Sequence, residues 1–81
     1  MVSDRERLQG ELSLLDEEIS KSSGLLDDMQ RFQTEDESGD KAAFAARRTF
    51  IDSLGEHIGR ASRARRRVAN ELAELDAVAS R

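Results

Sequence analysis

The side chain best suited to acid-base or metal chemistry is His57, the only histidine of the chain. Glu56 is its neighbour, and Glu18 comes near it if the chain folds back on itself as argued below. A zinc site needs three or four well-placed ligands, whereas a histidine beside a carboxylate at a helix edge is commonly a simple pair. No serine, threonine or lysine lies in a motif that would activate it, and no glycine pattern resembles a phosphate-binding loop. We therefore predict a non-enzyme without catalytic residues, metal, cofactor or small-molecule substrate.

The strongest local pattern is a basic row, defined as Arg60, Arg63, Arg66 and Arg67. On a helix, Arg60, Arg63 and Arg67 share an outer face that Arg66 borders, so their guanidinium groups could follow the phosphates of a nucleic acid. In the other interpretation, acidic residues of a second subunit or of the first helix neutralise the row; the candidates are Glu6, Glu11, Asp16 and Glu17. The net charge of −4, and the lack of aromatic residues among these arginines, favour neutralisation. Anion or nucleic-acid binding is kept as the alternative.

The helix that carries these residues has a heptad pattern. One column of the seven-residue repeat contains Phe44, Ile51, Ile58, Arg65, Leu72 and Ala79, and the other contains Arg47, Leu54, Ala61, Val68 and Leu75. Such a pattern predicts a long helix packed along a partner helix, because an isolated amphipathic helix has nothing to cover its apolar stripe.

An earlier segment has the same period and predicts a first helix. Its apolar stripe runs through Leu8, Leu12, Leu15, Ile19, Ser22, Leu26 and Met29. Ser3 can cap its start, with Glu6 at the spacing of a capping box. The segment 20–24 is rich in serine and ends in glycine, so we expect a continuous helix with a soft middle.

Composition limits the class of protein. The high charged content of 37% and the aromatic content of 4% are also typical of disordered chains, but the regular heptads argue against disorder. The chain has no cysteine, which fits a reducing compartment, and its first residues are not followed by the apolar run of a secretory signal. No stretch has the roughly 18 apolar residues of a membrane span. We expect a cytoplasmic protein.

Together these signals predict an all-α fold, an antiparallel two-helix hairpin forming one domain over residues 1–81. The helices are expected at about 3–33 and 41–78, joined by the polar loop 34–40, with residues 73–81 as an overhang. We expect a register in which the numbers of facing residues add to about 73. This register places Phe44 by Met29, Arg47 by Leu26, Arg65 by Leu8 and Glu18 by His57.

In this register, the loop end carries more apolar residues than two helices can cover. The predicted partner interface is Leu25, Phe32, Ala43, Phe50 and His57. Because two helices bury little surface, we expect a four-helix bundle completed by dimerisation or by a helix of another protein. The predicted function is a helical protein-protein interaction or assembly module; the alternative is a nucleic-acid-binding helical dimer that uses the basic row.

Overall fold

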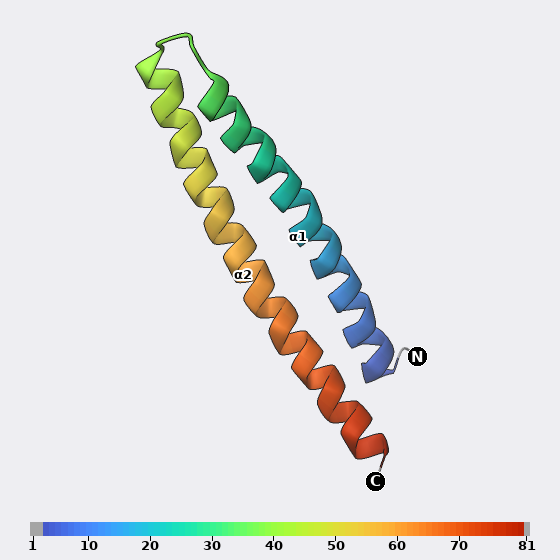
Figure 1. The fold of residues 1–81 in the computed structure, drawn as a ribbon. Coiled ribbons are helices and arrows are strands. Elements are labelled where there is room, and N and C mark those ends of the chain that lie inside the picture. Colours follow the sequence, from blue (N-terminus) through green and yellow to red (C-terminus); the bar gives the residue numbers. More distant parts are fainter. Residues whose placement is uncertain (1–2, 81) are drawn as a thin grey trace.

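The computed structural model, which describes residues 3–80, shows an antiparallel hairpin of two long helices (Figure 1). Helix α1 spans Asp4–Glu35 and helix α2 spans Lys41–Ala79. The prediction of an all-helical hairpin is confirmed, and both helices continue slightly farther than the sequence indicated. The molecule is a rod with extents of 63 × 18 × 18 Å. Its two helices lie side by side along their length and do not form a globule.

Each helix begins at a capping residue, Ser3 for α1, as the sequence indicated, and Asp40 for α2. The Ser3 hydroxyl accepts a hydrogen bond from the Glu6 backbone N–H at 3.2 Å. The Asp40 carboxylate accepts one from the Ala43 backbone N–H at 3.0 Å. Each bond satisfies an N–H group that has no partner within its helix. Helix α1 also continues unbroken through the serine-rich segment 20–24, as expected.

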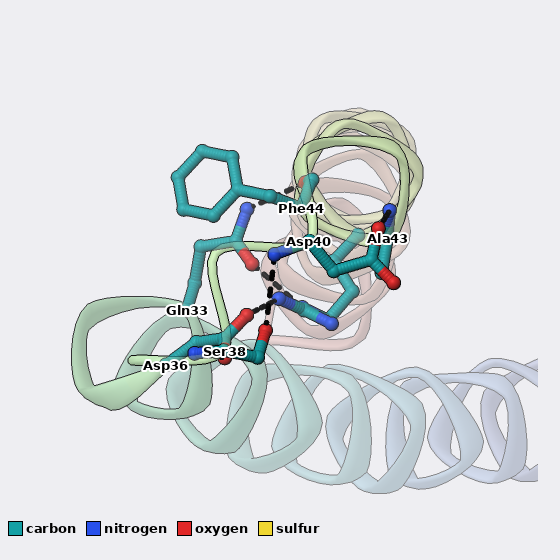
Figure 2. Close-up of polar contacts among 7 residues, drawn as sticks. Gln33, Asp36, Ser38, Asp40, Ala43 and Phe44 are labelled. Atoms are coloured by element: carbon teal, nitrogen blue, oxygen red, sulfur yellow. Dashed lines mark hydrogen bonds and ion pairs between the residues drawn. The ribbon is translucent and has the colours of Figure 1, made fainter.

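A polar cluster joins the two helices at the loop (Figure 2). The Arg47 guanidinium donates to the side chain of Gln33 at 2.7 Å and pairs with the Asp36 carboxylate. The Gln33 amide in turn donates to the backbone carbonyl of Phe44 at 2.7 Å. Gly39 makes the reversal with a φ of 75°, a left-handed conformation that favours glycine. We call Gln33, Asp36 and Arg47 the loop clamp.

The register differs from the expected one. Phe44 meets Gln33 instead of Met29, and the Arg47 guanidinium lies on the loop clamp instead of covering Leu26. Likewise, Arg65 pairs with Asp16 instead of lying beside Leu8. On α1, the contact of Phe44 lies four residues nearer the loop than predicted, and those of the longer Arg47 and Arg65 side chains lie seven and eight residues nearer. The expectation failed because apolar matching alone gave no weight to the hydrogen bonds of the loop clamp.

The open end of the hairpin, opposite the loop, is also covered more than predicted. Arg5 pairs with Asp76 at 3.3 Å, so α1 reaches into the segment that was expected to overhang. Helix α2 still continues past the start of α1 (Figure 1). Residue 81 of the predicted overhang lies outside the described residues. Neither described helix is long and apolar enough to cross a membrane.

The core between the helices is thin. Among residues 3–80, the buried apolar side chains are Leu8, Ala61 and Val68. The accessible surface is 6257 Å², whereas a compact protein of 9.1 kDa exposes about 4,900 Å². Phe44, predicted in the seam, is 41% exposed, and its ring projects to one side of the loop cluster (Figure 2). The hairpin therefore buries little of its own apolar surface.

Candidate functional site

Large exposed apolar side chains of α1 lie along one edge of that helix. Leu14, Leu25 and Phe32 follow one another at spacings of eleven and seven residues, which return to nearly the same side of a helix. Their exposed fractions are 68%, 44% and 56%. Several large apolar side chains exposed on one side of a helix can mark an interaction surface.

Helix α2 contributes a matching column at the same edge. Phe50, His57 and Val78 are separated by multiples of seven residues, and Phe50 and Val78 are 46% and 66% exposed. His57 Nε2 lies 2.8 Å from Glu18 Oε1, and Glu18 is seven residues before Leu25. This contact places the two columns next to each other. We define the apolar edge as Leu14, Leu25 and Phe32 of α1 with Ala43, Phe50, His57 and Val78 of α2.

All five residues of the predicted interface fall within this definition of the apolar edge, and their role in binding stays a prediction. Leu25, Phe32 and Phe50 are exposed, whereas Ala43 and His57 are half-buried. The Phe32 ring is oriented by the Arg47 guanidinium, whose central carbon lies 4.9 Å from the ring centroid. The sequence analysis missed Leu14 and Val78. The spacing of Val78 from His57, a multiple of seven, and the eleven-residue spacing of Leu14 from Leu25 could have identified them, had the edge been followed beyond the loop half.

The Glu18 and His57 pair interrupts the apolar edge near its middle. The hydrogen bond from His57, and a second from the Ser22 hydroxyl at 3.3 Å, hold the pKa of Glu18 below its ordinary value. Because the folded pKa is lowered, this stabilisation is present above the ordinary pKa of a glutamate. It is lost as the pH falls through the lowered value. A charged carboxylate and an imidazole therefore lie between the apolar members of the edge.

Toward the open end, the same edge is hollowed. Leu14, Leu15, Ala64 and Val68 supply the apolar lining of this hollow. Its charged rim has Arg7 and Glu11 on α1 and Arg67 and Glu71 on α2. We call it the open-end hollow; Glu11 and Ala64 lie seven residues from Glu18 and His57, in the columns of the apolar edge.

The favoured interpretation is that acids of the first helix or of a second subunit neutralise the basic row. Among the residues that the structure describes, no ion pair joins the row to the first helix. Within residues 3–80, none of its members has a carboxylate at ion-pair distance. Three of the acids expected to neutralise the row pair with other cations instead: Glu11 with Arg7, Asp16 with Arg65 and Glu17 with Lys21. Neutralisation by a second subunit and anion binding both stay predictions.

No cluster of three or more potential metal ligands occurs within the described part of the chain. Comparison with protein-family models, with curated proteins and with solved structures found no match. The apolar edge and the basic row are therefore interpreted from their own chemistry.

Proposed function

We propose that this chain is a non-enzymatic assembly module that self-associates through the apolar edge into a four-helix bundle. The observation that carries the proposal is the row of exposed leucine and phenylalanine side chains contributed by both helices at one edge. A second hairpin can cover both helices of this edge at once, as in an isologous dimer.

The surface area supports a partner of this size. The hairpin exposes roughly 1,400 Å² more than a compact chain of its mass would. A stable interface takes about 800 Å² from each partner, which this excess can supply. Its radius of gyration of 18.2 Å, against about 12 Å for a compact chain of this length, reflects the same lack of a second layer. Chains this small commonly gain the missing core by oligomerisation.

The first prediction concerns Phe50, at the centre of the loop half of the edge. Phe50→Glu places a charge where a second copy would pack, so we expect the dissociation constant of the dimer to rise by more than tenfold. The helical circular dichroism of the concentrated variant should stay close to that of the wild type, since Phe50 is already exposed within one hairpin. Sedimentation equilibrium measures the association.

Thr49→Glu is the matched control. Thr49 is the adjacent residue of the same helix and is exposed on the outer side, away from the seam. It adds the same charge and should leave the dimer intact. Equal association of wild type and Phe50→Glu, or equal loss in both variants, would contradict the assignment of the interface.

A second candidate function is binding of a polyanion such as a nucleic acid by the basic row. It is favoured by the absence, among residues 3–80, of carboxylates paired with these arginines. Arg63 and Arg66 lie on the outer part of α2, away from the open-end hollow that Arg67 lines. They would remain accessible in a dimer formed through the apolar edge.

This candidate predicts binding of nucleic acid that weakens steeply with salt. Arg63→Glu with Arg66→Glu should lower the affinity by at least tenfold, and the control Arg63→Lys with Arg66→Lys should retain most of it, because phosphate contacts depend mainly on charge. Fluorescence anisotropy with labelled single-stranded and double-stranded oligonucleotides gives the affinities. Absence of binding at low salt eliminates the candidate.

A further inference from the structure

The contact between Glu18 and His57 places these two residues at about the same level along the apolar edge. Seven residues closer to the loop, Leu25 of α1 lies level with Phe50 of α2. Another seven residues bring Phe32 level with Ala43. The edge therefore has a large apolar residue on at least one helix at each of these levels.

At the open end, each helix contributes one acidic and one basic residue to the rim of the open-end hollow. Arg7 and Glu11 form the α1 rim of the open-end hollow, and Glu71 and Arg67 form its α2 rim. Arg67 lies one turn beyond Ala64, which is level with Glu11, and a long helical side chain leans back toward the N-terminus of its helix. An acidic residue of one helix thus lies across the rim from a basic residue of the other helix.

From this arrangement we infer that the second copy docks with its loop at the same end, so that α1 of each copy lies on α2 of the other. This inference rests on the proposed self-association. A two-fold axis along the rod places Leu25 on Phe50 of the second copy and Phe32 on Ala43 of the second copy. The open-end rims then meet with opposite charges, Glu11 facing Arg67 of the second copy. Each of these contacts occurs twice in the dimer, because the interface is isologous.

The opposite arrangement, with loops at different ends, matches the edge poorly. It would place Phe32 and Ala43 at the open end, where the apolar Leu75 and Val78 lie among the charged residues Asp4, Arg7, Glu71 and Glu74. The same-end arrangement does bring the acidic loops of both copies together. That repulsion acts between exposed charges and is screened within about 8 Å at physiological ionic strength, whereas buried apolar contacts keep their full value.

The dimer also offers partners to one end of the basic row. Arg67 meets Glu11 of the second copy, and Arg60, seven residues before it, borders the level of Glu18 of the second copy. Arg63 and Arg66 stay on the outside. The inference thus divides the basic row into two arginines that serve assembly and two that face solvent.

A distance measurement tests the orientation. The chain has no cysteine, so Ser38→Cys in the exposed loop allows a single spin label on each copy. With loops at the same end, pulsed electron paramagnetic resonance should give a distance below about 30 Å. With loops at opposite ends the distance would be on the order of 50 Å, the length of α1 at 1.5 Å per residue, and would overturn the inference. Sedimentation of the labelled sample distinguishes this outcome from failure to dimerise, which would overturn the proposed function itself.

A charge-swap experiment tests the rim. Glu11→Arg and Arg67→Glu, each alone, set like charges against each other in both interfaces of a homodimer. Mixing the two variants restores opposite charges in both interfaces, so native mass spectrometry should show heterodimers in at least tenfold excess over either homodimer. The control mixture is Glu56→Arg with Arg63→Glu, which changes net charge identically on the outer face of α2. Equal heterodimer preference in both mixtures would contradict the rim contacts.

Discussion

The structure depends on one constraint: the seam between two helices is too narrow to bury the apolar side chains that these helices carry. A helix packed against one neighbour can cover only part of its apolar arc. Here the seam buries Leu8, Ala61 and Val68, while all three phenylalanines remain more than 40% exposed. Most of the large exposed apolar side chains lie along one edge, with Phe44 and Leu75 outside it, and so the constraint gives the hairpin a preferred direction in which to add a partner.

Polar contacts take over where the seam is thin. At the loop, the side chains of Arg47 and Asp36 are only 19% and 10% exposed, which shields their pairing from solvent. Hydrogen bonds from the backbone and hydroxyl of Ser38, with the Arg47 guanidinium, keep the pKa of Asp36 below its ordinary value. Elsewhere the cross-helix pairs, such as Arg65 with Asp16, are about half exposed and contribute less. Register is therefore set chiefly at the loop.

The sequence was sufficient to predict the elements because their signals are local. The heptads repeat along each helix. The caps Ser3 and Asp40, and Gly39 in the loop, each act within a few residues of a helix end. The predicted register was wrong because the actual register depends on hydrogen bonds that Gln33 and Arg47 make between the helices. The apolar periodicity of the sequence does not predict such bonds. The neighbouring positions of Glu18 and His57 were predicted correctly, since they lie in equivalent columns of the two heptads. Leu14 was missed because it lies outside the seam in a charged stretch, and the hollow beside it requires both helices.

The central claim is that the exposed edge is covered by a second copy and that this coverage stabilises the fold. Thermal unfolding of the wild-type chain, followed by circular dichroism over a thousandfold range of protein concentration, tests it most directly. If folding is coupled to dimerisation, the melting temperature rises by several degrees with concentration, since mass action favours the associated state. A melting temperature independent of concentration, for a particle that sediments with the 9.1 kDa mass of one chain throughout, would contradict the account.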